Sequence, residues 1–471
     1  MVFSSFEFLV YFLPGFLLVY YLAPARWKNS CLFAGSLIFY AVGVRNHPFY
    51  LALIVCSVLV NDRVGRAIGL AGRKSIRKRW LAAGLVYNFG WLVFFKYLDF
   101  ILENVNRAGA WMGASRQIPY LNLVLPIGIS FYTFQISSYL IDVYRGKVRA
   151  ERSVIALGTY LCMFPQLIAG PIVTYSSVNV QLRARKHSMA KVEEGLKLFT
   201  LGLGYKVLIA NQVAGLWHQV NTIGYDSIST PLAWMGIAAY SFQIYFDFYG
   251  YSLMAKGLGK LLGFQFPDNF SNPYLSLSMT EFWRRWHITL GSWFREYVYI
   301  PLGGNRKGFA RTIRNMLAVW LLTGLWHGAS WNFILWGFMM FVLISVEKMG
   351  WGKVTERFRL LGHLYMALVI PLTWLIFAVP DMGQIGLYLS RLFPFLGGVE
   401  GNVFAGDYVK YGKMYGISMI AALIFSTGLP ERMYRKWKFH VVTALLLTAV
   451  FWGAVYCIYL GMDDPFLYFN F

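Results

Sequence analysis

Charged residues and cysteine are scarce in this 471-residue chain. Asp, Glu, Lys and Arg together make up 14% of it, while 58% of its residues are hydrophobic and the mean hydropathy is +0.50. So little charge excludes an ordinary water-soluble protein of this length. The four cysteines, Cys31, Cys56, Cys162 and Cys457, are scattered and lie mostly in apolar runs, a pattern that predicts neither a disulfide framework nor a metal site.

Acidic residues are the scarcest charged class, with 21 Asp and Glu against 43 Lys and Arg and a net charge of +22. The basic residues lie in short connectors between apolar runs rather than on one continuous face. This arrangement favours cytoplasmic loops beside anionic lipid headgroups and argues against a nucleic-acid surface. We therefore expect membrane lipids among the partners and no nucleic acid.

Long apolar runs dominate the rest of the chain. Runs of about twenty residues predict an all-α polytopic membrane protein that forms a single integral membrane domain over residues 1–471. We expect about eleven transmembrane helices, with re-entrant and interfacial amphipathic helices beside them. Residues 1–21 have no basic start and no cleavage site, so they are interpreted as a retained first span. The predicted spans are residues 5–22, 30–45, 48–61, 80–102, 119–144, 194–216, 231–258, 312–346, 361–379, 411–430 and 440–461.

Helix breakers interrupt two of the apolar segments. Residues 154–175 contain Pro165 and the run Ala169-Gly170-Pro171, which predicts a re-entrant or broken helix lined by protein or water. If all basic connectors face the cytoplasm, residues 312–346 form a hairpin bent near Gly324 and Gly328. These two glycines stand four residues apart, a spacing that lets another backbone approach closely.

Residues 271–304 carry too much charge to cross a bilayer and predict a helix lying on its surface. Ser278 and Glu281 have the spacing of a capping box. Two interpretations stay open: an interfacial anchor, or a wall over a cavity whose arginines meet an anionic acyl donor. One predicted stripe holds Phe282, Trp286, Trp293 and Tyr297, and another holds Arg284, Arg285, Ser292 and Arg295.

His327 stands inside an apolar run that otherwise reads as membrane-spanning. An ionisable side chain at bilayer depth costs at least ~2 kcal/mol unless it faces protein or water. In a soluble core such a histidine is more often a packing residue, but its neighbours here favour a working site. Helical spacing places it on one face with Trp320 and Trp331, and Ser330 and Asn332 follow closely.

Asp247 is the other conspicuous charge within a predicted span. It is expected either to pair with a Lys or Arg of a neighbouring helix or, as the functional alternative, to orient an imidazole or line a tunnel. Lys206 and Asp142 stand near span ends, where snorkelling would explain them. The chain has no Gly-x-Ser-x-Gly elbow and no Walker loop, so any chemistry must rest on histidine.

Several of these segments together resemble the membrane-bound O-acyltransferase family, and within it the bacterial alginate O-acetyltransferase branch. The likeness extends over nearly the whole chain. Its segments are residues 1–5, 126–135, 169–171, 245–251, 269–274, 281–290, 324–336 and 466–471.

The resemblance implies that His327 is the catalytic residue and that His287 lies beside the same cavity. It also implies helices around a central tunnel that opens to the cytoplasm and to the exterior. The acyl donor would be a cytoplasmic thioester, with acetyl-CoA expected, no tightly bound cofactor and no metal. The expected lining residues are Trp326, Trp331, Asn332, Asp247, Trp283, Arg284 and Arg285.

The resemblance implies a multi-pass protein of the bacterial inner membrane. It also implies that such a protein passes acetyl groups to a periplasmic acetyltransferase or to another partner that modifies polysaccharides. Leu253, Met340 and Ala378 depart from residues that many relatives carry, which leaves alginate, cellulose and peptidoglycan open as acceptors. The function predicted is O-acetylation of an extracytoplasmic polysaccharide such as alginate. A transporter or flippase for a lipid-linked sugar, without acyl chemistry, is the alternative that spans and broken helices also fit.

For the chemistry, His327 is the candidate base that takes a proton from the attacking hydroxyl, since burial favours a neutral imidazole. A histidine that carries the acyl group transiently is the competing route. The donor to the oxyanion is left open among Asn332, Ser330, Trp331 and His287.

Overall fold

The computed structural model describes residues 1–114, 116–396, 403–461 and 467. Every regular element within these residues is a helix, which confirms the all-α prediction. The chain divides into two compact units. The first unit is Met1–Gly195 with Ala255–Pro267, and the second is Leu196–Met254 with the described residues from Asp268 on.

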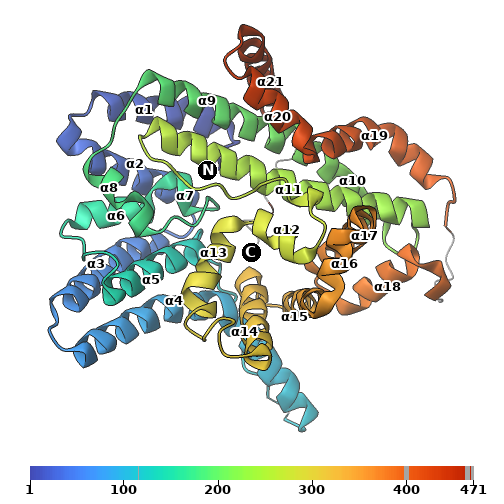
Figure 1. Cartoon of the computed structure of the whole chain (residues 1–471), viewed down its shortest axis with the longest axis horizontal. Coiled ribbons are helices and arrows are strands. Elements are labelled where there is room, and N and C mark those ends of the chain that lie inside the picture. Colours follow the sequence, from blue (N-terminus) through green and yellow to red (C-terminus); the bar gives the residue numbers. More distant parts are fainter. Residues whose placement is uncertain (115, 397–402, 462–466, 468–471) are drawn as a thin grey trace. The chain divides into compact units, whose positions relative to one another are not determined.

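The first unit is built around α5, whose side chains are buried along almost its whole length. Helices α3, α4 and α5 pack on one another, as Figure 1 shows in blue and teal. The helices of this unit are η1 (Glu7–Phe12), α1 (Leu13–Leu22), η2 (Ala25–Trp27), α2 (Lys28–Gly43), α3 (Phe49–Leu70), α4 (Lys74–Trp111), α5 (Ile129–Arg145), α6 (Val154–Cys162), α7 (Phe164–Leu167), α8 (Tyr175–Arg183) and the start of α9 (Met189–Gly204).

The broken helix predicted at residues 154–175 is confirmed. Pro165 cannot continue a helix, and α6 ends just before it. Tyr160 satisfies part of the irregular backbone, because its hydroxyl donates to the Gln135 and Val173 carbonyls at 3.1 and 3.0 Å. Backbone without helical hydrogen bonds is tolerated at such depth only when protein groups bond it in this way.

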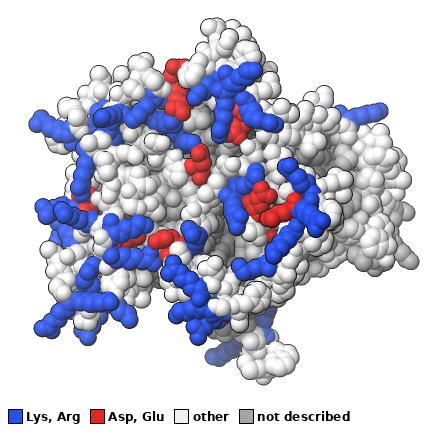
Figure 2. Space-filling view, viewed as in Figure 1, with Lys and Arg blue, Asp and Glu red and all other residues white. Residues whose placement is uncertain are grey.

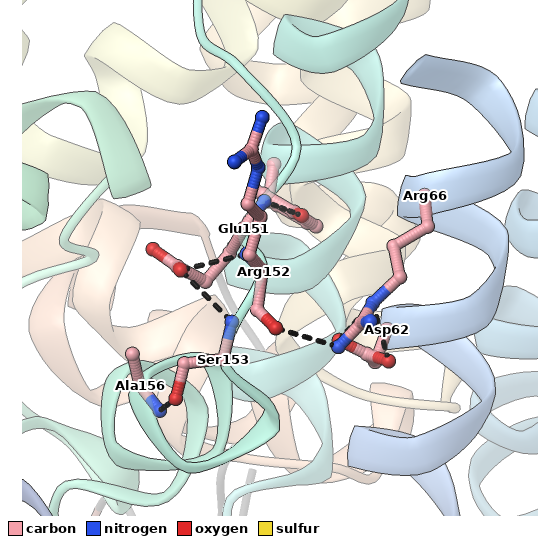
Figure 3. A network of polar contacts seen from close by, with 7 residues as sticks. Asp62, Arg66, Glu151, Arg152, Ser153 and Ala156 are labelled. Carbon is pink, nitrogen blue, oxygen red and sulfur yellow. Dashed lines mark hydrogen bonds and ion pairs between the residues drawn. The ribbon is translucent and has the colours of Figure 1, made fainter. Parts of the chain in front are cut away.

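A polar network ties α3 to the connector before α6 (Figure 3). Arg66 pairs with Asp62 at 2.9 Å and donates to the Arg152 carbonyl at 2.8 Å. The Glu151 carboxylate accepts from the backbone N–H groups of Arg152 and Ser153 at 2.7 and 3.0 Å. The connector thus has a fixed course between the helices that it joins.

The second unit holds the two histidines singled out by the sequence. Its helices are the rest of α9, η3 (Tyr205–Ala210), α10 (Asn211–Ile223), α11 (Thr230–Leu261) as far as Met254, η4 (Pro273–Leu275), α12 (Met279–Arg285), α13 (Ile288–Phe294), η5 (Arg295–Tyr299), α14 (Phe309–His327), α15 (Trp331–Val346), η6 (Glu347–Trp351), α16 (Gly352–Arg357), α17 (Arg359–Ala378), α18 (Met382–Leu392), η7 (Pro394–Leu396), α19 (Asp407–Ser426), α20 (Gly428–Trp437) and α21 (Val441–Tyr459).

Each predicted span coincides with at least one helix, but the number eleven stays a prediction. Among the described residues, four helices are long and apolar enough to cross a membrane, or five if α19 and α20, bent by 68°, form one span. The start of the span predicted at 119–144 is wrong, because α5 begins only at Ile129. Pro119 and Pro126 account for this, since proline lacks the N–H that a helix interior needs.

On the face drawn in Figure 2, Lys and Arg cover more of the surface than Asp and Glu, as expected for a chain with 43 basic and 21 acidic residues. The contact between basic connectors and anionic lipid headgroups stays a prediction.

The predicted hairpin over residues 312–346 is confirmed. Helix α14 ends at His327, and α15 returns from Trp331. The two helices cross where Gly324 and Gly337 face each other: a Cβ atom on Gly324 would lie 2.3 Å from the Phe333 carbonyl oxygen and 3.3 Å from the Gly337 Cα. Only glycine allows backbones to approach this closely.

We expect Gly324→Ala to lower the free energy of unfolding by about 1–3 kcal/mol, because α14 and α15 must move apart to admit the methyl group. Thermal unfolding of the purified protein in detergent measures the effect. Gly416→Ala is the matched control, since no atom lies within 4 Å of a Cβ at that position in α19. Equal melting temperatures for the two variants would contradict the close crossing.

Candidate active site

His327 is the last residue of α14 and is only 3% exposed. Three aromatic rings surround its imidazole, with ring centroids of Trp326, Trp336 and Phe377 at 4.9, 5.2 and 5.1 Å. They come from α14, α15 and α17, so the hairpin and its neighbour together enclose the histidine. His327 thus has an aromatic environment, which Trp326, Trp336 and Phe377 form.

Asn332 holds the start of α15 against the end of α17. Its amide nitrogen donates to the carbonyls of Ile376 and Phe377 at 3.1 and 3.2 Å, and Ser330 donates to its amide oxygen. These bonds keep Phe377 beside His327. Because they engage both amide hydrogens of Asn332, the structure favours a positioning role for this residue over that of an oxyanion donor. Trp331, by contrast, is 50% exposed.

His287 lies in the break between α12 and α13, with φ of +42°. A non-glycine residue adopts this left-handed conformation only where the surrounding structure imposes it, often at functional sites. Here Asn269 imposes it: its Oδ1 lies 3.1 Å from His287 Nδ1 and also accepts from the Thr289 N–H and hydroxyl at 3.3 and 2.9 Å.

The Asn269 bonds also fix the tautomer of His287. The Asn269 amide nitrogen donates to Ser252 Oγ at 3.1 Å, so the oxygen is the atom that faces the imidazole. An amide oxygen only accepts, and Nδ1 must therefore carry the proton. Burial lowers the pKa of His287 to about 3, which keeps the ring neutral near pH 7. Its Nε2 then holds a lone pair that can accept a proton.

One tryptophan connects the two histidines. The Trp326 ring centroid lies 6.0 Å from that of His287 and 4.9 Å from that of His327. The ring of Phe248 also contacts His287, edge to face, with the two ring centroids 4.7 Å apart. The two imidazoles thus share one aromatic neighbour in a water-poor environment.

A cavity of about 440 Å³ reaches His287. The lining is mostly apolar, and its polar side chains include Arg284, Ser292 and Arg295. His327 is not among the residues that line it. The full lining is Thr280, Trp283, Arg284, His287, Ile288, Leu290, Gly291, Ser292, Phe294, Arg295, Tyr299, Met316, Val319, Trp320, Thr323 and Ile344.

The two arginines predicted at the site are in different environments. Arg284 is exposed and lines the cavity. Arg285 instead donates to the Glu281 carboxylate at 2.6 Å. Of the lining residues expected from the sequence, Trp283 and Arg284 lie at this cavity, and Arg295, noted in the same stripe, lies there too.

The prediction of one surface helix over residues 271–304 is wrong. The segment is divided at His287, and Phe282, Trp286, Trp293 and Tyr297 are buried in the protein. The alternative, a wall over a cavity, agrees with the lining. Ser278 caps α12 as predicted, since its hydroxyl accepts from the Glu281 N–H at 3.1 Å.

Glu347 is a positioning residue that the sequence did not reveal. Its carboxylate accepts from the backbone N–H groups of Met279 and Thr280 at 2.6 and 2.8 Å. A carboxylate at a helix N-terminus is stabilised by the free N–H groups and the helix dipole. Glu347 therefore holds the start of α12, the helix that carries Trp283 and Arg284. Along the chain, Glu347 is 68 residues from Met279 and 67 residues from Thr280.

Asp247 pairs with Lys206 at 2.8 Å, and each side chain is 1% exposed. The pairing interpretation is confirmed, whereas the expectation that Lys206 snorkels to the surface is wrong. Asn211 Oδ1 accepts from the same ammonium at 2.9 Å, and Asp247 accepts from the Leu467 N–H at 3.0 Å. Asp142 is fully buried too, with Lys147 3.9 Å away. Buried charges require such partners to offset their desolvation.

Among the residues that the structure describes, no group of three or more His, Cys, Asp and Glu side chains could hold a metal ion.

Known proteins resemble the chain over between about half and all of its length. The family profile described as MBOAT, membrane-bound O-acyltransferase family, matches residues 148–379. The "Probable alginate O-acetylase AlgI" of Azotobacter vinelandii is 40% identical over 399 residues, which cover 84% of this chain and 78% of that protein. The "Peptidoglycan O-acetyltransferase" of Helicobacter pylori is 33% identical over 531 residues, an alignment that covers 100% of this chain and 98% of that protein. The "Teichoic acid D-alanyltransferase" of Bacillus subtilis is 28% identical over 246 residues, which cover 48% of this chain and 60% of that protein.

Proposed function

Because this chain belongs to the membrane-bound O-acyltransferase family, in its alginate O-acetylase-like branch, we propose that it transfers acetyl groups from cytoplasmic acetyl-CoA towards an extracytoplasmic polysaccharide. It does so from the bacterial inner membrane, through a tunnel between its helices, with a periplasmic acetyltransferase or similar protein as partner. The relatives named for alginate and for peptidoglycan support a polysaccharide acceptor. The observation that carries the proposal is the buried His287 at the cavity, whose ring and that of His327 both contact Trp326.

The residues that line the cavity beside His287 support a coenzyme A thioester as the acyl donor. Arg284 and Arg295 bring two permanent positive charges to a lining that is otherwise mostly apolar. Guanidinium groups bind phosphate oxygens in pairs of hydrogen bonds, and coenzyme A carries phosphates at one end. Arg285, which pairs with Glu281, is not assigned to this task.

The reaction proposed is direct acyl transfer. The acceptor oxygen attacks the thioester carbonyl, a C–O bond forms, the C–S bond breaks, and the hydroxyl proton passes through an imidazole to the departing sulfur. We assign proton acceptance to His327, since a histidine enclosed by three rings in a membrane protein has a functional explanation more readily than a structural one. His287, whose Nε2 can accept but not donate, is assigned to the donor side, where that nitrogen orients the acyl donor by accepting a hydrogen bond from an amide N–H of coenzyme A.

Arg284→Gln is expected to raise the KM for acetyl-CoA about tenfold, the effect of losing about 1.4 kcal/mol of charge-assisted hydrogen bonding. The turnover number should change little, because the phosphates are remote from the reacting carbonyl. Arg311→Gln removes an equal charge from an exposed residue of α14 that does not line the cavity, and it should leave KM unchanged. Equal shifts in both variants would indicate a loss of general electrostatic attraction and would refute the assignment of Arg284.

Release of free thiol from acetyl-CoA by the purified protein tests the proposal as a whole. With the acceptor polymer or its partner present, we expect thiol release coupled to formation of an O-acetyl ester. A protein that cleaves no acyl-CoA under these conditions, yet moves a lipid-linked sugar across a proteoliposome membrane, would be a transporter, and the acyltransfer proposal would be rejected.

A further inference from the structure

Three basic side chains of the first unit meet on the same aromatic ring. The Lys28 ammonium lies 4.5 Å from the ring centroid of Tyr20, the Arg185 guanidinium lies 5.9 Å from it, and the centroids of His187 and Tyr20 are 5.8 Å apart. Lys28 begins α2, whereas the other two belong to the segment between α8 and α9. We refer to Lys28, Arg185 and His187 as the basic cluster.

The basic cluster is held in place by bonds that do not involve a carboxylate. Tyr20 donates its hydroxyl to the Leu262 carbonyl at 2.8 Å, and Lys28 donates to the Tyr20 carbonyl at 3.1 Å. Arg185 donates to the side-chain oxygen of Asn29, and the Asn29 amide nitrogen donates to the Leu182 carbonyl at 2.8 Å. These contacts come from four separate parts of the chain, so the cluster is part of the fold rather than a chance meeting of mobile side chains.

Positive charge in the basic cluster is not compensated within the part of the chain that the structure describes. None of its three members forms an ion pair with an Asp or Glu side chain there. Burial, and then the neighbouring Arg185, lower the pKa of Lys28. Burial and the charges of Lys28, Arg185 and Lys191 lower that of His187. Mutual repulsion of this kind is relieved by an anion.

The basic cluster also contains polar atoms that still lack a partner. Arg185 Nη1 and His187 Nε2 are both buried from solvent, and neither has a hydrogen bond to any described residue. Leaving a buried polar atom unsatisfied is costly, so such atoms commonly mark a ligand site. Phosphate oxygens suit a guanidinium and an ammonium side by side.

Exposed apolar side chains next to the basic cluster favour the phosphate of a lipid headgroup over that of a soluble phosphate ester as its ligand. Leu22 is 76% exposed and Trp27 is 54% exposed, and both lie in the short stretch between Tyr20 and Lys28. An exposed tryptophan beside basic residues at the end of an apolar helix is typical of the membrane interface, at the depth of lipid headgroups. A soluble phosphate ester would gain nothing from this apolar surround.

We propose that Lys28, Arg185 and His187 form a binding site for the phosphate of an anionic phospholipid headgroup. The guanidinium donates through Nη1 and the ammonium through its remaining hydrogens, while the acyl chains of the lipid lie along the exposed apolar residues. This site is separate from the proposed acyl-transfer chemistry and does not depend on it.

Native mass spectrometry of the detergent-purified protein with phosphatidylglycerol or phosphatidylcholine tests the site. Arg185→Gln combined with Lys28→Gln should weaken phosphatidylglycerol binding at least about tenfold. Lys186→Gln is the matched control, because it removes one charge from the same segment but from an exposed side chain outside the basic cluster. It should bind like the wild type, and phosphatidylcholine should bind weakly to all forms.

Arg185→Lys covers the case in which the double variant fails to fold. It keeps the charge but loses the planar pair of donors, and it should bind phosphatidylglycerol more weakly than the wild type at an unchanged melting temperature. Equal loss in the Lys186→Gln variant, or equal binding of the two lipids by the wild type, would overturn the site. Displacement of the lipid by equimolar inorganic phosphate or acetyl-CoA would overturn the lipid as its ligand.

Discussion

Replacing His327 by alanine is expected to lower the rate of acetyl transfer by about 10²- to 10⁴-fold, the usual contribution of a general base. The expectation rests on its position at the end of α14, enclosed by Trp326, Trp336 and Phe377. Acetyl ester formation from radiolabelled acetyl-CoA measures the rate, and the binding of acetyl-CoA should be retained. His363→Ala, which removes an exposed imidazole of α17, should be fully active.

His327→Ala also removes a ring that packs among three others, so His327→Phe is needed as a second variant to separate packing from chemistry. It fills the aromatic enclosure and removes the titratable nitrogens. A base role predicts that both variants lose activity while the phenylalanine variant keeps the melting temperature of the wild type. Activity in the folded phenylalanine variant would eliminate His327 as the base.

Asn269 is expected to control the pH profile through His287. In the wild type, burial holds the pKa of His287 near 3, so the imidazole is neutral above that pH and its Nε2 stays available. Asn269→Asp places a carboxylate beside Nδ1–H and favours the charged imidazolium, which raises the pKa of His287. Because protonated His287 cannot accept at Nε2, the acid limb of the rate should move to higher pH.

The magnitude follows from the usual effect of an adjacent opposite charge, about 1–3 pH units. The pH dependence of kcat/KM is the measurement, since it reports ionisations of the free enzyme. Asn269→Ser removes the amide oxygen without adding a charge and should lower the rate without moving the acid limb. An Asn269→Asp profile that falls uniformly at every pH would mean that Asn269 is structural and does not set the state of His287.

Much of the fold could be predicted because apolar runs and prolines act locally. The hairpin of α14 and α15 follows from the run 312–346 and its glycines, and the break after α6 follows from Pro165. The span predicted from residue 119 begins too early, because the apolar residues around Pro119 and Pro126 keep the local hydropathy high. Hydropathy alone cannot detect the loss of helical hydrogen bonds at two prolines.

The site was only partly predictable, because its decisive contacts join residues distant in sequence. His287 was identified by resemblance, but the break at its left-handed backbone depends on Asn269, 18 residues earlier. The predicted stripe from Phe282 to Tyr297 requires one continuous helix. The structure has no such helix, because the segment is interrupted between α12 and α13 at His287. The snorkelling predicted for Lys206 is wrong because the residues next to it in sequence do not indicate Asp247 as its partner.

The fate of the acetyl group in sealed proteoliposomes tests the central proposal most directly. Acetyl-CoA is supplied on one side only, and a polysaccharide acceptor with its acetyltransferase partner is supplied on the other. Acyl transfer across the membrane predicts free thiol on the donor side and O-acetyl ester on the acceptor side in equal amounts, with both lost in His327→Ala. Ester formation that continues undiminished in the folded His327→Ala protein, or thiol release without any acceptor ester, would contradict it.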